Sequence, residues 1–375
     1  MKDVKVGLIG AGQIAKTHVL AMSSIPMLYN LSESRPSFSV LAEATDSLAE
    51  EAARRFGFAG WTSDWRKVTG SSDVELVDIV TPTYLHHDPA MDAAERGKNI
   101  ICEKPLATTA KQSREIFEAA ERAGVVNMVG FNYRRLPAVM FCKELAETGK
   151  LGEIYQFTSS FMEDWANADF GLTWRFNSEN AGAGVLADLG SHIIDLARFI
   201  IGDIASVSGT RKTFIEERSI SGTSSRGKSD VDDTALALLK FKSGTLGRIE
   251  ASWCALGRRV NLEFEVNGSE GSVYYNLERP NEVQVYSKND QKTVQGYRTV
   301  LMGPIHPYGK GMVFPAAGTG MGYEESIINE FYDLFSSIQD RSKHLSPTFY
   351  DGWRVNQAIE AIVESSEKES WVKID

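Results

Sequence analysis

Cysteine is scarce in this sequence. The 375 residues include three cysteines, at positions 102, 142 and 254, and their spacing fits neither a disulfide framework nor a zinc-binding motif. We therefore expect no metal-binding residues and no disulfide-stabilised secreted fold. Sparing use of cysteine is typical of proteins that work in a reducing compartment.

Long apolar runs are missing as well. No stretch of the sequence approaches the ~20 apolar residues that a transmembrane helix needs. The first short run, residues 6–9, is interrupted by Gly7 and is not followed by a signal-cleavage pattern. The sequence therefore predicts a cytoplasmic protein with no membrane partner.

An excess of basic residues is the third absence. Lysine and arginine together number 40, against 50 aspartates and glutamates, which gives a formal net charge of −10. A surface that binds nucleic acid depends on a basic face, so a nucleic-acid partner is not expected.

The length and the early pattern of the chain predict two domains. A chain of 375 residues is longer than one hydrophobic core usually organises. Over the first part, strand-like and helix-like segments alternate, which indicates an α/β fold with a parallel sheet and crossover helices. The expected strands are 4–9, 38–44, 76–80, 99–102 and 125–130, and the expected helices are 13–24, 47–56, 89–97 and 109–123.

Strands dominate the second part of the chain. They are expected at 154–162, 207–214, 235–241, 245–252, 260–267, 271–275 and 282–287. Turn residues separate most of them, which predicts a large, mostly antiparallel open sheet with helices on one side. The segment 219–230 is rich in Ser, Gly and Arg and predicts a mobile loop. We therefore divide the chain into domains 1–130 and 131–375.

A glycine-rich turn follows the first strand. Gly10, Gly12 and Ala15 form the pattern G-x-G-x-x-A between a strand and a helix. The first glycine permits a tight turn, the second lets the backbone approach a pyrophosphate, and the helix start at Gln13 and Ile14 offers amides to phosphate oxygens. The pattern predicts a Rossmann domain that binds a dinucleotide at Gly10, Gly12, Gln13 and Ile14. A glycine turn that binds nothing is the alternative.

A carboxylate after the second strand is expected to bind the adenosine ribose of the dinucleotide. Glu43 is the candidate, although it follows the glycine turn by more than the usual ~20 residues. An insertion at residues 26–36 accounts for the excess, and Asp46 is the second choice. A carboxylate at this point would repel a 2′-phosphate, so NAD is expected rather than NADP.

Two further motifs supply acid–base and electrostatic groups. Glu103-Lys104-Pro105 follows an apolar strand, and Asp188 and His192 lie four residues apart in a helix-like segment, so that both project from one face. Oxidation of a secondary alcohol needs a base that titrates near neutral pH, such as His192. It also needs a cation that stabilises the developing alkoxide, such as Lys104. Asp188 is predicted to orient the lysine or to bind a neighbouring hydroxyl.

Simpler roles for these residues remain open. Asp188 also suits a helix N-cap, His192 suits a histidine satisfied within the fold, and Lys104 suits a solvated lysine at a strand end. A metal site on Asp188 and His192 lacks an evident third ligand.

These motifs resemble those of the Gfo/Idh/MocA oxidoreductase family, which includes glucose–fructose oxidoreductase and inositol dehydrogenase. The resemblance covers essentially the whole chain and rests on segments 7–12, 81–86, 103–105, 188–192 and 351–372. It implies an N-terminal Rossmann domain and a C-terminal domain whose open sheet often serves oligomer formation. A homodimer or homotetramer is therefore expected.

The resemblance also implies roles for individual residues. Lys104, Asp188 and His192 would be the catalytic set, with His192 as the acid–base group. The implied neighbours of the cofactor, those at its nicotinamide end included, are Thr81, Pro82, His86, Glu103 and Lys104.

The implied substrate is a sugar, a sugar derivative or a cyclitol. Aromatic side chains suit the apolar CH face of such rings. Besides Lys104, Asp188 and His192, the expected substrate-binding residues are Asn132, Tyr133, Arg134, Trp165, Trp174 and Arg175. We therefore expect an NAD-dependent dehydrogenase acting on a secondary alcohol. A redox-neutral NAD-dependent glycosidase and a non-catalytic cofactor-binding sensor are the alternatives.

Overall fold

The computed structural model describes residues 3–29, 35–316 and 318–374. The chain packs into two compact units. The first contains Met1–Asn132 and Tyr323–Arg354, and the second contains Tyr133–Gly322 and Val355–Asp375. The division into functional domains at residue 130 stays a prediction. The first compact unit also includes a segment from late in the chain, Tyr323–Arg354.

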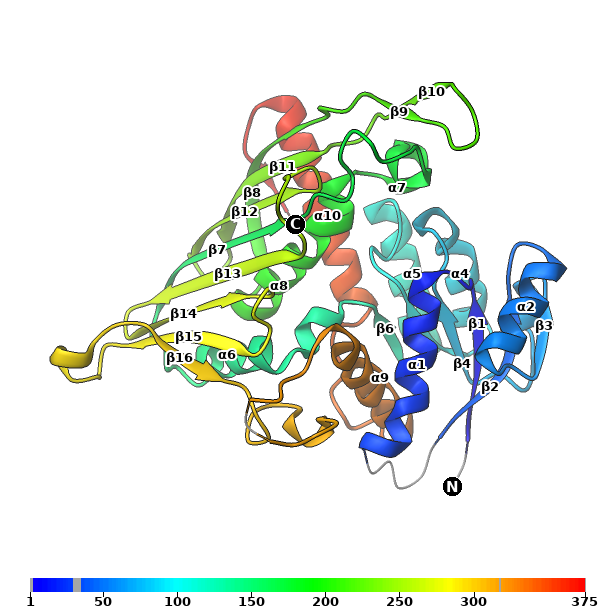
Figure 1. Ribbon diagram of the computed structural model, residues 1–375, viewed down its shortest axis with the longest axis horizontal. Coiled ribbons are helices and arrows are strands. Elements are labelled where there is room, and N and C mark those ends of the chain that lie inside the picture. The colour runs from blue at the N-terminus through cyan, green and yellow to red at the C-terminus, as the bar shows by residue number, and fades with distance from the viewer. Residues whose placement is uncertain (1–2, 30–34, 317, 375) are drawn as a thin grey trace. The chain divides into compact units, whose positions relative to one another are not determined.

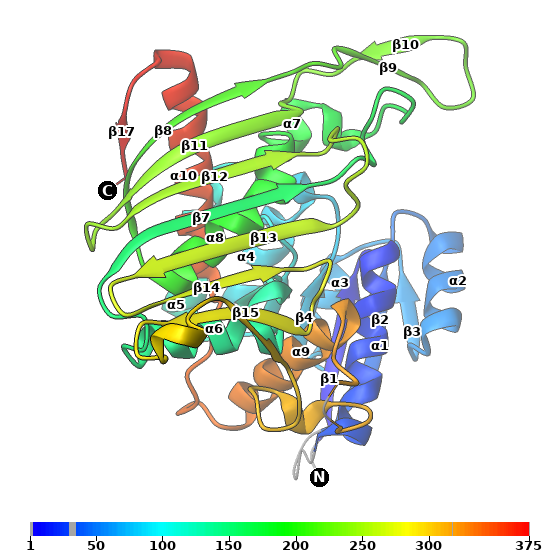
Figure 2. The same ribbon diagram turned by 60° about the vertical axis from the view of Figure 1, so that its left-hand side comes forward.

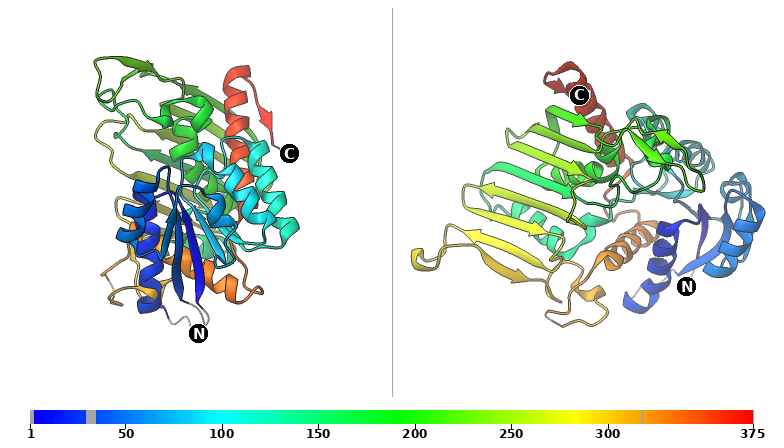
Figure 3. Two further views of the ribbon diagram at one scale, coloured as in Figure 1. Left: turned by 90° about the vertical axis from the view of Figure 1, so that its right-hand side faces the viewer. Right: turned by 45° about the horizontal axis from the view of Figure 1, so that its top comes forward.

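The first unit is built on a six-stranded parallel sheet with the order β3-β2-β1-β4-β5-β6, which confirms the predicted Rossmann fold. Helices lie on both sides of the sheet (Figure 3, left). The strands are β1 (Val4–Ile9), β2 (Pro36–Ala42), β3 (Gly60–Thr62), β4 (Leu76–Ile79), β5 (Asn99–Cys102) and β6 (Asn127–Val129). The helices are α1 (Gln13–Leu28), α2 (Asp46–Phe56), α3 (Arg66–Thr69), α4 (His87–Glu95), α5 (Ala110–Ala123) and α9 (Tyr323–Gln339), with the single turn η1 (Thr83–Leu85). A further turn, η2 (Asn132–Arg135), begins at the last residue of this part of the first unit and continues into the second.

Local signals explain where the crossover helices begin and end. The hydroxyl of Thr45 accepts from the amide of Leu48 at the start of α2, and that of Thr109 accepts from Gln112 at the start of α5. Both helices end at a glycine in the left-handed conformation, a common helix stop. These boundaries agree with the sequence prediction because capping chemistry is local.

The region between the first helix and the second strand differs from the prediction. Helix α1 runs through Pro26 to Leu28 instead of ending at residue 24. Ile25, near that end, is fully buried, so packing favours continuation of the helix despite the proline. Residues 30–34 of the predicted insertion lie outside the described residues.

Helix α9 completes the core of the first unit. It lies beside α1 (Figure 1), and Phe331 and Phe335 are buried with residues of α1 and of the sheet in one apolar cluster. The hydroxyl of Tyr29 donates to Oδ1 of Asn329 over 2.5 Å. The contact joins segments 300 residues apart in sequence, which no local pattern predicts.

The second unit contains a nine-stranded, mostly antiparallel sheet with the order β16-β15-β14-β13-β7-β12-β11-β8-β17, in which β7 and β12 are parallel. Figure 2 shows this sheet with α6 and α8 on one face, as predicted. Its strands are β7 (Ile154–Met162), β8 (Ile204–Lys212), β11 (Thr234–Phe241), β12 (Leu246–Ser252), β13 (Asn261–Gly268), β14 (Gly271–Asn276), β15 (Glu282–Ser287), β16 (Arg298–Leu301) and β17 (Val372–Lys373). The helices are α6 (Pro137–Glu147), α7 (Ser178–Ala181) and α8 (Ser191–Ile201), with turns η3 (Trp174–Phe176), η4 (Leu186–Gly190), η5 (Lys292–Val294) and η6 (Gly309–Gly311), and α10 (Phe349–Lys368) runs from the first unit into the second.

The segment 219–230, predicted as a loop, contains the second strand of a hairpin, so the loop prediction is wrong for residues 226–228. Strands β9 (Glu217–Ser219) and β10 (Arg226–Lys228) pair antiparallel. Arg218 is buried, donates to the carbonyl oxygens of Ala166 and Asn167, and forms an ion pair with Asp233 at 3.1 Å. A buried arginine anchors one end of a segment whose composition alone is typical of a loop.

Candidate active site

The glycine-rich turn lies at the carboxyl end of β1. Gly10 has a φ of +100°, and a Cβ there would stand 3.0 Å from the carbonyl carbon and oxygen of Val80. A side chain would therefore be both conformationally strained and too close to the backbone that follows β4. The turn brings Gly10 beside the Val80–Thr81 peptide, at the place where the strand order reverses.

Gly12 forms the N-cap of α1 and has no side chain that could accept from the first-turn amides. Apart from Gly12 itself and its two chain neighbours, no described residue has an atom within 4 Å of the position that a Cβ on Gly12 would occupy. Gln13 is exposed and Ile14 is half-buried at the start of the helix. Open space before a helix N-terminus fits the pyrophosphate of a dinucleotide.

Glu43 follows β2 and points back to the glycine turn. Its Oε2 accepts from the backbone amide of Ala11 over 2.8 Å. The second candidate, Asp46, is exposed in the first turn of α2, where a carboxylate is favoured by the helix dipole alone. The hydrogen bond places Glu43 at the glycine turn, and its role as the ribose ligand stays a prediction.

Thr81, Pro82 and His86 line the next loop at the same edge of the sheet. Oγ1 of Thr81 is buried and has no hydrogen-bond partner among the described residues, as expected for a hydroxyl that meets a ligand. The ring of His86 lies between two backbone carbonyl oxygens, 2.8 Å from that of Thr81 and 3.1 Å from that of Pro105. His86 therefore joins the Thr81 loop to the segment that contains Lys104, and burial lowers its pKa.

Lys104 follows β5 and is half-buried. Its backbone amide donates to Oε2 of the preceding Glu103 over 3.1 Å, and its peptide bond to Pro105 is cis. The predicted cofactor residues thus form a continuous line along the carboxyl ends of β2, β1, β4 and β5.

Two residues beneath this line were missed by the sequence analysis. His18 on α1 and Asp78 on β4 are both fully buried, and they contact each other. A carboxylate inside the apolar strand Leu76-Val77-Asp78-Ile79 was the available signal, since a buried acid requires a partner.

Asp188 and His192 lie in two different types of helix that follow one another in the second unit. Asp188 lies in η4, which is a π-helical turn, and His192 lies in the first turn of α8. Hydrogen bonds in a π-helical turn join residues i and i+5 instead of i and i+4. The prediction that both residues lie on one regular α-helix is therefore wrong. The carboxylate of Asp232 accepts from the amides of Gly184 and Leu186 and thereby supports the start of the turn.

Aromatic rings surround His192. The centroid of the Tyr133 ring lies 4.7 Å from that of the imidazole, and the centroid of Phe161 lies 6.0 Å away. Two predicted site residues, Tyr133 and His192, are therefore in contact. Packing of this kind restricts the orientation of the imidazole ring.

Arg134 has a structural contact. Its Nε donates to Oδ2 of Asp195 over 2.7 Å, and both side chains are buried. Asp195 is on α8, so the pair holds η2 against the helix that contains His192. The sequence analysis expected Arg134 to bind substrate, and its guanidinium group is engaged with Asp195, so the substrate role stays a prediction.

The remaining predicted substrate residues have mixed surroundings. Asn132 donates to the hydroxyl of Ser326 over 2.7 Å inside the first unit. In the second unit, Trp165 packs edge-on against Phe170 and Trp253. The guanidinium carbon of Arg175 lies 4.6 Å from the ring centroid of Trp174. These contacts leave the substrate roles of all four residues as predictions.

Two other observations concern metal ions and membranes. Among the described residues, no group of three or more His, Cys, Asp or Glu side chains is placed to hold a metal ion. No helix in the described ranges has the length and apolar character needed to cross a bilayer.

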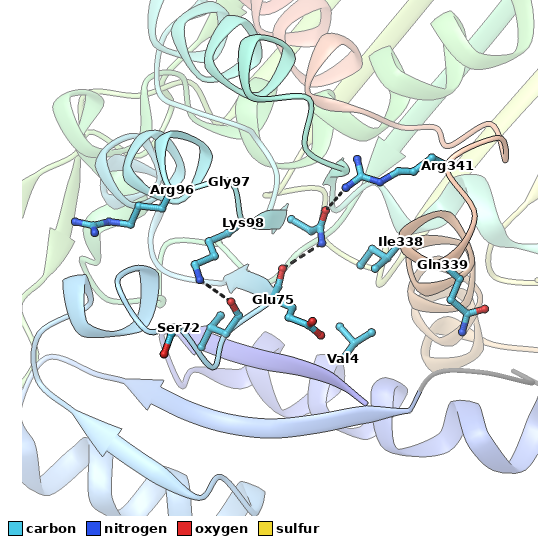
Figure 4. Close-up of a pocket in the computed structure, with 11 residues that line it drawn as sticks. Val4, Ser72, Glu75, Arg96, Gly97, Lys98, Ile338, Gln339 and Arg341 are labelled. Carbon is cyan, nitrogen blue, oxygen red and sulfur yellow. Dashed lines mark hydrogen bonds between the residues drawn. The ribbon is translucent and has the colours of Figure 1, made fainter. Parts of the chain in front are cut away.

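A pocket of about 600 Å³ lies at the opposite, amino-terminal edge of the parallel sheet (Figure 4). Several of its polar side chains already have protein partners. Lys98 donates to the carbonyl oxygens of Ser71 and Val74, and Arg341 donates to Asn99. This pocket is separate from the line of cofactor residues.

Comparisons with known proteins cover the whole chain. The model described as an oxidoreductase family with an NAD-binding Rossmann fold matches residues 4–131, and the model of the GFO/IDH/MocA C-terminal domain matches residues 139–274. The first match confirms the expectation that NAD is the cofactor.

Individual relatives are similar over nearly their full length. Levoglucosan dehydrogenase of Pseudarthrobacter phenanthrenivorans is 42% identical, with 100% of this chain and 99% of that protein covered. A solved levoglucosan dehydrogenase in complex with NADH and levoglucosan has 43% identity and a TM-score of 0.96, with 100% of both chains covered. The NAD-dependent scyllo-inositol 2-dehydrogenase of Bacillus subtilis is 30% identical, with 76% of this chain and 77% of that protein covered.

Replacement of Gly12 by valine tests the cofactor turn. Because the Cβ position is open within the described structure, we expect Gly12→Val to lower the free energy of unfolding by only about 1 kcal/mol. The side chain would occupy the space of the pyrophosphate, so the affinity for NADH should fall by about tenfold or more, measured by fluorescence titration. Gly296→Val, at another open glycine, is the control. An unchanged dissociation constant for Gly12→Val would contradict the assignment.

Proposed function

We propose that this chain, which belongs to the Gfo/Idh/MocA oxidoreductase family, is an NAD-dependent dehydrogenase that oxidises a secondary hydroxyl group of a sugar ring. The observation that carries the proposal is the 42% identity to a levoglucosan dehydrogenase over the whole chain. The intact line of cofactor residues on the first unit supports it. Levoglucosan, an anhydrosugar, is the substrate that we propose first.

In the proposed mechanism, bound NAD supplies the hydride acceptor. His192 takes the proton of the substrate hydroxyl as the hydride leaves. The packing of Tyr133 and Phe161 around His192 and the buried Arg134–Asp195 pair on the same helix support a fixed ring orientation. A fixed base loses less entropy when it meets its substrate.

Lys104 stabilises the negative charge that develops on the substrate oxygen. An ammonium group suits this role because its attraction for an alkoxide exceeds its attraction for a neutral hydroxyl. Asp188 orients the ammonium group of Lys104 or accepts from a neighbouring sugar hydroxyl. Its place in a π-helical turn supports a functional role, since such turns are frequent at functional sites.

The aromatic residues of the second unit favour a ring-shaped polyol. Trp165 and Trp174 are both half-buried, so parts of each ring remain accessible for contact with the CH face of a pyranose. The contacts of Trp165 with Phe170 and Trp253 would hold that ring in place. Cyclitols are the second substrate class, in line with the inositol dehydrogenase among the relatives.

A turnover assay tests the proposed reaction. We expect levoglucosan and NAD to give an increase in absorbance at 340 nm, with NADP much less effective because Glu43 would repel its 2′-phosphate. Pyranosides and inositols complete the panel. If no sugar or cyclitol reduces NAD, the dehydrogenase proposal is wrong. Tightly bound NAD in such a silent enzyme would favour a redox-neutral glycosidase or a sensor.

Substitution of Lys104 tests the catalytic assignment. Lys104→Met keeps the length of the side chain but removes its charge, so we expect kcat to fall by about 10²–10³-fold, with the NADH dissociation constant changed by less than about threefold. His192→Asn should lower kcat by about 10²–10⁴-fold. Lys111→Met, at a lysine with 85% side-chain exposure, should behave as wild type. Full activity of Lys104→Met would refute its proposed role.

We also propose that the chain forms a homodimer or homotetramer. The sheet face opposite α6 and α8 exposes Leu236, Leu238 and Leu246, at 42%, 54% and 58% of their surface. Exposed apolar side chains on one face of an open sheet favour burial against a second surface. Light scattering at micromolar concentration should give a mass of two or four chains, and a stable monomer would contradict this proposal.

A further inference from the structure

His18 bridges two carboxylates beneath the Lys104 segment. Its Nδ1 lies 3.1 Å from each carboxylate oxygen of Asp78, and its Nε2 lies 3.3 Å from Oε1 of Glu103. The ring therefore connects β4 with the residue that follows β5. It does so from α1, the helix whose N-terminus begins at the glycine-rich turn.

The geometry suits a protonated ring, because a neutral imidazole can donate a hydrogen bond from only one nitrogen. Burial lowers the pKa of His18, but the two carboxylates outweigh burial and raise it to about 10. Burial raises the pKa of Glu103, but its hydrogen bond to His18 and the charges of His18 and Lys104 bring it below its ordinary value. At neutral pH the charge of His18 thus favours an ionised Glu103.

Other contacts confine the Glu103 carboxylate. A Cβ on Gly130 would stand 2.8 Å from Oε1 of Glu103, so glycine leaves room for the carboxylate at this position. The ring of Phe331, which is fully buried, lies edge-on to His18 with the centroids 5.0 Å apart. In such dry surroundings the attraction between charges is less screened than at the surface.

The second oxygen of Glu103 reaches the backbone of the catalytic segment. Oε2 accepts from the amide of Lys104 over 3.1 Å. One carboxylate therefore receives His18 on one oxygen and the Lys104 backbone on the other. A displacement of this carboxylate would move the backbone from which the Lys104 side chain extends.

We propose that His18 is a positioning residue for Lys104, because it fixes the Glu103 carboxylate that holds the Lys104 backbone. The inference rests on the proposed role of Lys104 in alcohol oxidation. The imidazole ring of His18 connects α1, the helix that follows the glycine-rich turn, with the segment that contains Lys104. A misplacement of a catalytic group by about 1 Å lowers the rate by about 10²-fold, so His18 affects turnover without contacting substrate.

Hydrogen exchange at the Lys104 amide tests the link directly. In His18→Gln and His18→Ala, measured without cofactor or sugar, we expect this amide to exchange about tenfold faster or more. Gly130→Ala should give the same local increase, since its methyl group displaces Glu103 while His18 stays in place. Two independent variants keep the test informative if His18→Ala fails to fold.

Kinetics provide the second measurement. In the same variants, kcat for sugar oxidation should fall by about 10- to 100-fold. KM for the sugar and the dissociation constant for NADH should stay within about threefold of wild type. His18→Gln should retain more activity than His18→Ala, because the amide can still donate to one carboxylate.

Tyr29→Phe is the matched control. It removes the buried hydrogen bond from Tyr29 to Asn329, which also joins α1 to α9 but does not involve Glu103. We expect a lower melting temperature in this variant, with wild-type exchange at Lys104 and wild-type kcat.

Two results would overturn the proposal. One is a wild-type exchange rate at Lys104 in both His18→Gln and Gly130→Ala. The other is a loss of protection across the first unit that Tyr29→Phe reproduces, because His18 would then only stabilise the fold. If the wild-type protein oxidises no sugar, the proposed function fails, but the exchange measurement still decides whether His18 holds the Lys104 backbone.

Discussion

The common carboxyl edge of the parallel sheet is the constraint on which the candidate site depends. Strands β1, β2, β4 and β5 run in one direction, so the segments that follow them meet at one edge. Four candidate residues are far apart in sequence, but each lies one or two positions after the end of a strand: Gly10, Glu43, Thr81 and Lys104. Tight packing between Gly10 and Val80 keeps two of these segments together. The alignment of the predicted cofactor residues therefore depends on the strand order of the sheet as much as on the types of residue.

Buried ion pairs also fix the positions of segments at or near the candidate site. Three buried pairs, His18–Asp78, Arg134–Asp195 and Arg218–Asp233, each connect different segments of the chain. A buried ion pair contributes little net stability compared with apolar packing, yet loss of one partner is costly. Such pairs therefore select one arrangement over others. The first pair lies behind the Lys104 segment, and the second lies on the helix of His192. The third anchors the hairpin, where Arg218 also contacts Ala166 and Asn167.

Relatives of this chain constrain its chemistry more than its substrate. The family match and the cofactor turn agree on NAD and on oxidoreductase chemistry. The relatives include dehydrogenases named for levoglucosan and for scyllo-inositol, compounds that share a ring with secondary hydroxyl groups. The proposed base and cation act on that shared feature. Discrimination between such rings would depend on the side chains around them, and Trp165 and Trp174 are the proposed contributors.

The sequence by itself determined the alternating α/β order, most strands of the second sheet, and the glycine turn, because periodicity and capping are local. It also supplied the candidates Glu43, Lys104, Asp188 and His192 through their motifs. Only the tertiary structure decided that Arg134 pairs with Asp195, that residues 217–228 form an anchored hairpin, and that His18 joins Asp78 to Glu103. These outcomes depend on burial and on partners distant in sequence, since a charged side chain leaves water only where the fold provides its counter-charge.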